Sequence, residues 1–338
     1  MSRRIAVLGT GAIGGMLGGH LAHSGVDVTM ISAYRRETAQ TLDREGIYIN
    51  GARGSFHTPI KAVFLDDIPA EVKFDYIFLG LKANNFVDAV SRVAPHLAED
   101  GCIISLQNGI NEELLVPIVG EKRVVAGISF AGGLQKDSNH YEDHDGHFVV
   151  GEMDGSMTPR LEEIVEILSH ARPSASSDHV RVQQWEKLGT VALHVPCCTI
   201  TGSYMQEGFD NPYVQRFFPL LAKEVFAVAE ADGCTGFTIQ GHTREEYEQG
   251  STSVPTGQSS EGKGKIPEKV VDAYTRDIQR GAELEIDFTN GAIVRLGKRY
   301  GVPTPANEAL ISAIRDIEAG KAVAGNDLAS RLLEELGG

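Results

Sequence analysis

Cysteine is scarce in this sequence, with only four among 338 residues. Their spacing matches no zinc-binding pattern, and so few cysteines exclude a small disulfide-rich secreted domain. We therefore predict reduced thiols in a cytoplasmic protein. The alternative is a strained disulfide between two adjacent cysteines. The four are Cys102, Cys197, Cys198 and Cys234.

Two further absences narrow the class of partner. No run approaches the ~18 consecutive apolar residues of a membrane-spanning helix, so we expect no membrane partner. The 31 Lys and Arg residues are outnumbered by 46 Asp and Glu residues, and no basic tail or stripe offers a surface for nucleic acid. We predict a small-molecule substrate. If that molecule is an anion, local cations and helix N-termini must hold it.

The first half of the chain alternates short apolar runs with helical segments. This βαβ rhythm is typical of an α/β fold with a mostly parallel, doubly wound sheet. Two short, polar-flanked strands near 139–143 and 147–150 predict an antiparallel addition to that sheet, as a hairpin. The strands expected before them are 5–8, 26–31, 74–81, 102–106 and 124–128, with helices near 35–45 and 84–97.

After about residue 180 the strand pattern stops and helical patterns take over. The length also suggests two domains. We predict a dinucleotide-binding Rossmann domain over residues 1–178 and an all-helical substrate and catalytic domain over residues 179–338. The Gly- and Ser-rich stretch 249–265 predicts a loop. The helices expected in the second domain are 181–203, 212–232, 267–282, 285–300 and 306–320.

A glycine-rich turn follows the first expected strand and opens the first expected helix. In such a motif the first glycine allows a tight turn, the second lets a pyrophosphate approach the backbone, and the third lets helix and strand pack closely. The helix N-terminus offers N–H groups and a positive dipole end to the phosphates. A turn that only packs is the alternative. The residues predicted to bind the cofactor are Gly9, Gly11, Ala12, Ile13 and Gly14.

The end of the second expected strand bears on the choice of cofactor. No Asp or Glu stands there to accept a hydrogen bond from a ribose 2′-hydroxyl. Ser32, Arg35 and Arg36 could instead hold a 2′-phosphate, so we predict NADP. The alternative for the two arginines is an ordinary solvated helix surface.

Two polar residues, Lys82 and Asn108, each follow an apolar strand. Ligands in open α/β sheets bind outside the carboxyl ends of the strands, so both are expected on the same edge as the glycine-rich turn. A solvated lysine at a helix start and an asparagine that caps a turn are the alternatives.

Lys187, Val191 and Val195 are spaced four residues apart and share one face of an expected helix. Burial lowers the pKa of a lysine and a nearby carboxylate raises it, so such a lysine can be tuned as an acid or base. A lysine that snorkels at a domain edge is the alternative.

Histidines and acids cluster around the two short strands. Alternate residues of a strand face opposite sides, so this cluster is not expected to converge, and we predict no metal. The residues are His140, Glu142, Asp143, His144, Asp145 and His147.

Seven short motifs occur along the chain in a fixed order and span nearly all of it. They are Gly9-x-Gly11-Ala12-x-Gly14, Leu81-Lys82-Ala83, Gln107-Asn108-Gly109, Gly146-His147 leading to Gly151-Glu152, Trp185-x-Lys187-Leu188, Glu285-Ile286-Asp287-x-x-Asn290-Gly291, and Gly301-Val302-Pro303-Thr304-Pro305-x-Asn307. Each motif is weak by itself. As an ordered set they resemble the ketopantoate reductase (2-dehydropantoate 2-reductase) family.

The resemblance implies an oxidoreductase in which NADPH gives a hydride to the C2 carbonyl of a 2-oxo acid. By position, Lys187 would donate the proton to the developing alkoxide, and Glu285 would orient and tune that lysine or hold substrate. Lys82 and Asn108 would lie by the nicotinamide and the reacting carbonyl. The default reaction is the reduction of 2-dehydropantoate to pantoate, a step of pantothenate biosynthesis.

The sequence departs from the family at several positions. Asparagines usual four and eight residues after the lysine are Val191 and Val195 here, and a serine frequent twelve residues before the glutamate is Ala273. The arginine often found at the end of the second strand falls at Ala33, so Arg35 or Arg36 would substitute for it.

These departures leave other functions open. A site that loses its hydrogen-bonding partners can lose up to ~10⁴ in discrimination. The second hypothesis is therefore a paralogue acting on a less polar carbonyl or hydroxy compound, and the third is a non-catalytic nucleotide sensor. Helical second domains offer dimer surfaces, so a homodimer is the assembly we consider.

Overall fold

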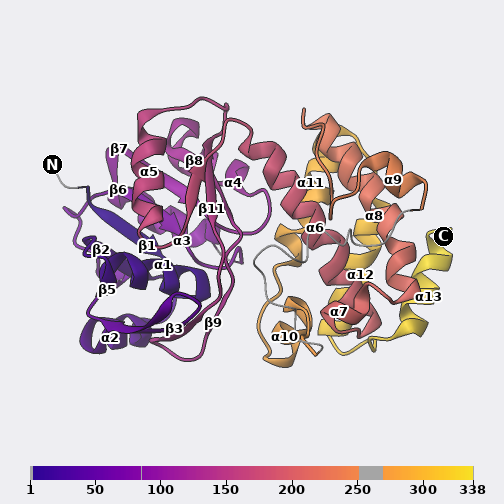
Figure 1. Cartoon of the computed structure of the whole chain (residues 1–338), viewed down its shortest axis with the longest axis horizontal. Coiled ribbons are helices and arrows are strands. Elements are labelled where there is room, and N and C mark those ends of the chain that lie inside the picture. The colour runs from indigo at the N-terminus through magenta and orange to yellow at the C-terminus, as the bar shows by residue number, and fades with distance from the viewer. Residues whose placement is uncertain (1–2, 85, 251–268, 338) are drawn as a thin grey trace. The chain divides into compact units, whose positions relative to one another are not determined.

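The computed structural model describes residues 3–84, 86–250 and 269–337. The chain divides into two compact units, residues 1–181 and 182–338, and each is described by itself. The first unit holds every named strand of the described chain, and the second is helical (Figure 1). The α/β fold class with a helical C-terminal part is confirmed.

An eight-stranded sheet forms the centre of the first unit. Its order is β12-β11-β8-β7-β6-β1-β2-β5, and every pairing is parallel except that of β11 with β8. The predicted antiparallel addition near residues 147–150 is therefore correct. The strands are β1 (Ile5–Leu8), β2 (Val28–Ser32), β5 (Lys61–Phe64), β6 (Phe74–Leu79), β7 (Leu97–Ser105), β8 (Val124–Ser129), β11 (Phe148–Glu152) and β12 (Ser174–Ser176).

The central strands are apolar because helices cover the sheet. Every residue of β1 and β8 is buried, as expected for parallel strands between two layers. Ile5 and Val7 of β1 belong to one core cluster with Met16 and Leu17 of the first helix. The helices of this unit are α1 (Ala12–His23), α2 (Arg36–Glu45), α3 (Phe86–Val93), α4 (Glu112–Val119) and α5 (Pro159–Ser169).

A second, four-stranded sheet corrects part of the prediction. The strand expected at 139–143 does not form a hairpin with the one at 147–150, because it pairs with two other strands in a separate sheet. Three strands of that sheet, over 47–51, 54–58 and 133–135, were not predicted. The segment 47–51 has only two buried apolar residues, Ile47 and Ile49, and the segment 54–58 has a single apolar residue, Phe56, so the apolar signal is weak. The sheet contains β3 (Ile47–Gly51), β4 (Gly54–Thr58), β9 (Gly133–Gln135) and β10 (His140–Asp143).

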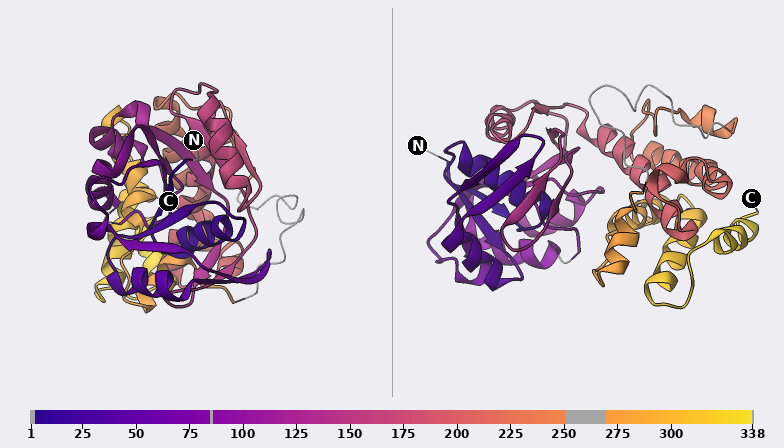
Figure 2. Two further views of the ribbon diagram at one scale, coloured as in Figure 1. Left: turned by 90° about the vertical axis from the view of Figure 1, so that its left-hand side faces the viewer. Right: turned by 60° about the horizontal axis from the view of Figure 1, so that its bottom comes forward.

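The second unit is built from helices, seen from two further sides in Figure 2. Most of the expected helices are present. The one expected over 285–300 is interrupted at Thr289, and that expected over 267–282 is short in its described part. The predicted loop 249–265 lies outside the described residues from 251 onward. The helices are α6 (Val180–Thr201), α7 (Met205–Gly208), α8 (Pro212–Ala231), α9 (Arg244–Glu248), α10 (Ala273–Gln279), η4 (Ile286–Phe288), α11 (Asn290–Tyr300), α12 (Pro305–Glu318) and α13 (Asn326–Glu335).

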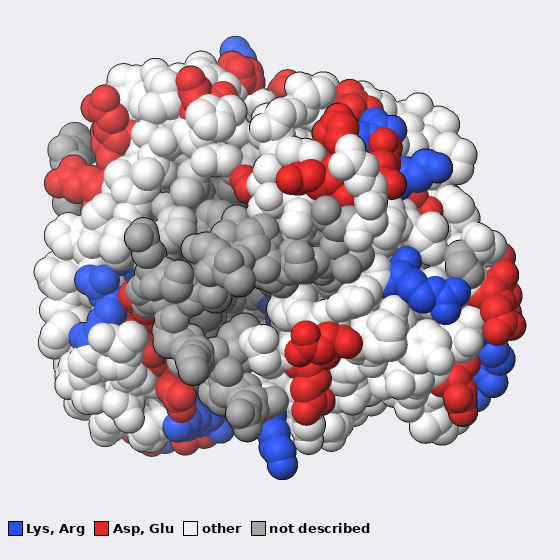
Figure 3. All heavy atoms as spheres, turned by 45° about the vertical axis from the view of Figure 1, so that its right-hand side comes forward, with Lys and Arg blue, Asp and Glu red and all other residues white. Residues whose placement is uncertain are grey.

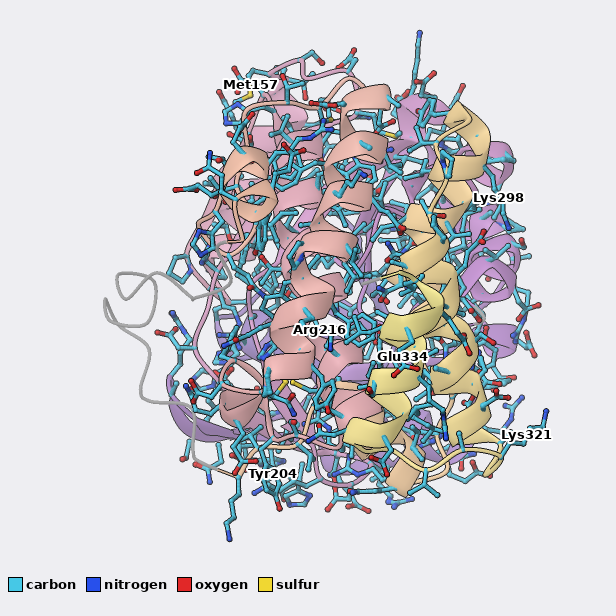
Figure 4. The ribbon with its side chains drawn as sticks, turned by 90° about the vertical axis from the view of Figure 1, so that its right-hand side faces the viewer. Met157, Tyr204, Arg216, Lys298, Lys321 and Glu334 are labelled. Carbon is cyan, nitrogen blue, oxygen red and sulfur yellow. The ribbon has the colours of Figure 1, made fainter. Side chains whose placement is uncertain are left out.

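Charged side chains of both signs are mixed on the surface. On the face shown in Figure 3, Lys and Arg stand singly or in small groups among Asp and Glu. On the helical unit, Lys298 and Glu308 form such a pair at 3.5 Å, with Lys298 at the outer edge of α11 (Figure 4). In the described part of the chain, no helix is long and apolar enough to cross a membrane. All four cysteines are buried and none of them is in a disulfide, so Cys197 and Cys198 are not bonded to each other.

Candidate active site

The glycine-rich turn after β1 is shaped by close backbone contacts. Gly9 has a φ of +115°, which L side chains rarely adopt, and a Cβ there would lie 2.4 Å from the backbone nitrogen of Leu81. A Cβ on Gly14 would lie 2.1 Å from the carbonyl oxygen of Gly9. A Cβ on Gly11 would meet only the Gly80 carbonyl oxygen, at 3.7 Å, so space remains beside its backbone. The first and third glycines are thus required by packing, and the second leaves an open approach.

The N-terminus of α1 is free of protein caps. Gly11 is the N-cap residue, no side chain caps the helix, and its first turn contains no acidic residue. Ala12 and Ile13 begin the helix and are half-buried. The first N–H groups of a helix have no intrahelical partner, so they can donate to a phosphate.

Gly80 and Gln107 join three loops at the carboxyl ends of β1, β6 and β7, and neither residue is among those predicted to form the site. Gly80 packs against Gly14 so closely that a Cβ on Gly80 would lie 2.3 Å from the Gly14 Cα. The Gln107 side-chain amide donates to the Leu81 carbonyl oxygen at 3.0 Å. Gly80 follows a strongly apolar strand directly, which was an available signal. These contacts fix the loop edge at the point where the strand order reverses.

Tyr141 supports the glycine-rich turn from the four-stranded sheet. Its hydroxyl donates to the Thr10 carbonyl oxygen at 2.8 Å, and its ring fills the space where Gly15 lacks a Cβ. Burial raises the pKa of this hydroxyl, so it remains a hydrogen-bond donor. No sequence signal pointed to Tyr141, because its strand was assigned to the wrong sheet.

The three residues predicted to hold a 2′-phosphate, at the end of β2, have different surroundings and different partners. Ser32 is buried, and its hydroxyl donates to the Arg35 carbonyl oxygen at 2.8 Å. Arg36 forms an ion pair with Asp67, and its guanidinium lies 4.3 Å from the centre of the Phe64 ring. Arg35 is exposed, and no carboxylate of the described residues pairs with it. Arg35 is therefore the cation at this strand end that is available to an anion.

Lys82 and Asn108 are both exposed, in the loops after β6 and β7. The Asn108 carbonyl oxygen accepts a hydrogen bond from the Asn111 side chain at 2.8 Å, which fixes the backbone of this loop. The two loops are the ones joined through Gln107 and Leu81. The side chains thus lie on neighbouring strand ends, as predicted.

In the helical unit, α6 presents the predicted face. Lys187, Val191 and Val195 are half-buried, whereas Leu188 and Ala192 next to them are buried. The four-residue spacing therefore forms a continuous, partly accessible stripe of one cation followed by two valines.

Ala273 lies near the far end of this stripe. Thr199, four residues beyond Val195, donates its hydroxyl to Asp272 at 2.7 Å. Asp272 is the N-cap residue of α10 and also accepts the N–H groups of Tyr274 and Thr275. Ala273 is the first residue of that helix, so its position against α6 is fixed by Asp272.

Glu285 is half-buried at the turn that precedes η4. Nearby, the buried Tyr274 hydroxyl is hydrogen-bonded to Thr289. Burial, with a further contribution from the Glu285 charge, raises the pKa of Tyr274. Asn290, five residues after Glu285, donates to the Ala192 carbonyl oxygen of α6 at 3.0 Å. This contact joins the segment that carries Glu285 to the helix that carries Lys187.

The histidines near the short strands have separate partners. His140 contacts Asp137, His144 contacts Glu142, and Asp143 is buried between His20 and Arg172. No group of three or more His, Cys, Asp or Glu residues in the described ranges could hold a metal ion.

A doubly wound sheet with a glycine-rich turn where its strand order reverses defines the class of dinucleotide-binding α/β proteins. Comparison with known proteins identifies the family. Residues 5–155 match the family model of the ketopantoate reductase PanE/ApbA, and residues 179–318 match that of the ketopantoate reductase PanE/ApbA C terminal. The chain belongs to the ketopantoate reductase family of oxidoreductases, as the ordered motifs predicted.

Individual relatives cover almost the whole chain. The 2-dehydropantoate 2-reductase of Archaeoglobus fulgidus is 27% identical over 325 residues, which are 94% of this chain and 99% of that protein. The structure of a PanE/ApbA family ketopantoate reductase from Ralstonia eutropha JMP134 matches with a TM-score of 0.77 and 25% identity, over 94% of this chain and 99% of that one. The ternary structure of D-mandelate dehydrogenase with NADH and anilino(oxo)acetate has the same fold, with a TM-score of 0.80, 21% identity and the same coverage. NAD(P)-dependent reduction of a 2-oxo acid is the class of reaction that these similarities support.

Proposed function

We propose that this protein is an NADPH-dependent reductase that converts a 2-oxo acid to a 2-hydroxy acid, with 2-dehydropantoate as the default substrate. The observation that carries the proposal is Lys187, which lies half-buried on an otherwise apolar helix face and which the ordered motifs place at the family's lysine. We assign cofactor binding to residues 1–178 and substrate binding and catalysis to residues 179–338.

The cofactor fits the features of the first unit. The uncapped N-terminus of α1 at Gly11, Ala12 and Ile13 would hold the pyrophosphate, since Gly9 and Gly14 keep the turn tight against the helix. Lys82 and Asn108 would lie by the nicotinamide. When bound, the reduced nicotinamide supplies a hydride to C2 of the 2-oxo acid.

The helical unit would supply the proton. Lys187 donates a proton to the oxygen on C2 as negative charge develops there, which yields the 2-hydroxy acid. Glu285 orients Lys187 and favours its charged form, or holds the substrate. The substrate would contact Val191 and Val195 of the stripe and Ala273 of α10. These residues contribute apolar contacts where hydrogen-bonding groups are usual in the family.

We propose NADP in preference to NAD because Arg35 is available to a 2′-phosphate. Arg36 is already paired with Asp67 and stacked on Phe64. The Ser32 hydroxyl already donates a hydrogen bond to the Arg35 carbonyl oxygen, so it would donate to a phosphate only after rotating.

A second candidate is reduction of a 2-oxo acid with a less polar substituent. Val191 and Val195 are partly accessible on the stripe, so an apolar group of the substrate could pack on them. The structure of the D-mandelate dehydrogenase of the same fold contains anilino(oxo)acetate, which carries an apolar aromatic ring, and this favours the second candidate. A non-catalytic nucleotide sensor is less favoured, because sensing requires neither Lys187 nor Glu285.

The substrate is tested by following NADPH oxidation with 2-dehydropantoate beside a panel of 2-oxo acids that carry branched aliphatic or aryl groups. Efficient turnover of 2-dehydropantoate would identify pantoate as the product. A strong preference for apolar 2-oxo acids would select the second candidate. Tight NADPH binding without turnover of any of them would contradict both. A cytoplasmic location and a homodimer remain predictions.

A further inference from the structure

Helix α6 contains a proline, Pro196, in its interior. Proline has no N–H, so the carbonyl of the residue four positions earlier, Ala192, loses its usual helical donor, and the proline ring also crowds that carbonyl. Ala192 is buried and lies between Val191 and Val195 of the stripe. A buried carbonyl without a donor is costly, so another group has to replace the missing N–H.

The side chain of Asn290, 98 residues after Ala192 in the sequence, supplies the donor that replaces the missing N–H. Its side-chain nitrogen lies 3.0 Å from the Ala192 carbonyl oxygen and 2.9 Å from the side-chain oxygen of Asn307, and both asparagines are fully buried. An amide NH₂ has two hydrogens, and each has an acceptor here. Asn290 is also the first residue of α11, directly after the break at Thr289.

The orientation of both amides is fixed by a buried carboxyl group. Glu224 accepts the Asn307 side-chain NH₂ at 2.7 Å and the backbone N–H groups of Ala306 and Asn307 at 2.7 and 3.0 Å. The Asn307 NH₂ must therefore face Glu224, which turns its oxygen toward Asn290 and points the Asn290 NH₂ at Ala192. The network connects α8, α12, α11 and α6.

We propose that Asn290 is a positioning residue for the active site: it replaces the hydrogen bond that Pro196 removes from α6 and thereby fixes the segment carrying Glu285 against the helix carrying Lys187. The inference rests on the proposed roles of Lys187 and Glu285. Asn290 itself is buried, and its amide nitrogen is fully used within the protein.

The hydrogen-bond replacement is tested by a stability cycle that does not depend on activity. Asn290→Leu should raise the equilibrium constant for unfolding about tenfold or more, because the Ala192 carbonyl and Asn307 lose a partner. In a Pro196→Ala background the increase in the unfolding constant caused by Asn290→Leu should be clearly smaller, since residue 196 then supplies a helical N–H to the Ala192 carbonyl. Pro219→Ala, in the interior of α8, is the control and should leave the effect of Asn290→Leu unchanged. Equal effects in all three backgrounds would overturn the proposal.

If Asn290→Leu does not fold, Asn290→Asp takes its place in the same cycle. The shape is then kept, but an oxygen replaces the NH₂ group and faces two acceptors. The variant should be more destabilised in the wild-type background than in the Pro196→Ala background. The absence of that difference would count against the proposal as before.

Positioning is tested by the pKa of the Lys187 side chain, measured by NMR in the free protein, and by the pH profile of kcat. In Asn290→Leu, the measured pKa of Lys187 should fall as Glu285 moves away, kcat should fall at least tenfold, and the KM for NADPH should stay unchanged. Pro196→Ala should restore part of the loss. If the pKa of Lys187 is unaltered in Asn290→Leu, Asn290 does not position the active site and the proposal is overturned. If the wild-type protein reduces no 2-oxo acid, the proposed function fails, whereas the stability cycle and the Lys187 titration still judge this inference.

Discussion

At the scale of single residues, two glycines of the first unit are expected to have different roles, one in packing and the other in cofactor binding. Gly80→Ala would place a Cβ 2.3 Å from the Gly14 Cα, so we expect a loss of about 2 kcal/mol or more in the free energy of unfolding, with weaker NADPH binding. Gly11→Ala meets no close atom, so it should keep its stability and lose NADPH affinity. Denaturant unfolding and fluorescence titration with NADPH measure both. Equal stability loss in the two variants would refute the assignment.

The two arginines after β2 form a second matched pair. Arg35→Ala should weaken NADPH binding about tenfold to a hundredfold, the size of a lost charge-assisted hydrogen bond, and leave NADH binding unchanged. Arg36→Ala should affect stability slightly, through its contacts with Asp67 and Phe64, and NADPH affinity little. Isothermal titration of both cofactors checks this. A larger loss of NADPH affinity in Arg36→Ala than in Arg35→Ala would reverse the assignment.

His194 predicts an acid-sensitive stability. It is buried and stacked on Phe209, with ring centres 3.8 Å apart, and burial lowers its pKa from 6.5 to about 4. Between pH 6.5 and 4 the unfolded chain therefore takes up a proton that the folded chain does not, so stability falls as the pH falls, by about 3 kcal/mol in all. His194→Phe should flatten this window in denaturant unfolding at several pH values. An unchanged slope would exclude His194 as its source.

At the scale of elements, the stripe on α6 was predictable because four-residue spacing alone places Lys187, Val191 and Val195 on one face. We expect Val191→Asn to raise the kcat/KM for 2-dehydropantoate about tenfold relative to an apolar 2-oxo acid, since one hydrogen-bonding group returns to the site. Thr190→Asn, at an exposed position next to it, is the control and should not change this ratio. A ratio that moves equally in both variants would show that Val191 does not face the substrate.

Other elements could not be predicted, for physical reasons. Strand β3 alternates buried Ile47 and Ile49 with exposed residues over only five positions, and β4 contains a single apolar residue, Phe56, so both patterns are too short to predict a strand. The pairing of β10 with β3 joins segments about 90 residues apart, and no local pattern encodes such a partner. No local pattern predicts the contact of Asn290 either, because its partner on α6, Ala192, lies 98 residues earlier in the sequence. Local signals thus predicted the central strands of the large sheet and the long helices of the second unit, whereas the short strands and the long-range hydrogen bonds had to come from the structure.

At the scale of the whole molecule, the order of strands and then helices predicted the fold class, and the ordered motifs predicted the family. The first unit contains a glycine-rich turn tied to the neighbouring loops by Gly80 and Gln107. The second contains Lys187 and Glu285 on segments that Asn290 joins. A reductase needs both parts, one to bind the cofactor and the other to supply the proton. Lys187 is therefore expected to be essential for turnover and dispensable for cofactor binding.

The most direct measurement compares Lys187→Ala with the wild-type protein, in NADPH binding and in turnover of the best 2-oxo acid. We predict that the NADPH dissociation constant stays within about threefold, while kcat falls by about 10²-fold or more, because the proton donor is lost. A Lys187→Ala protein that turns over at a comparable rate, or one that no longer binds NADPH although it is folded, would contradict the assigned role of Lys187.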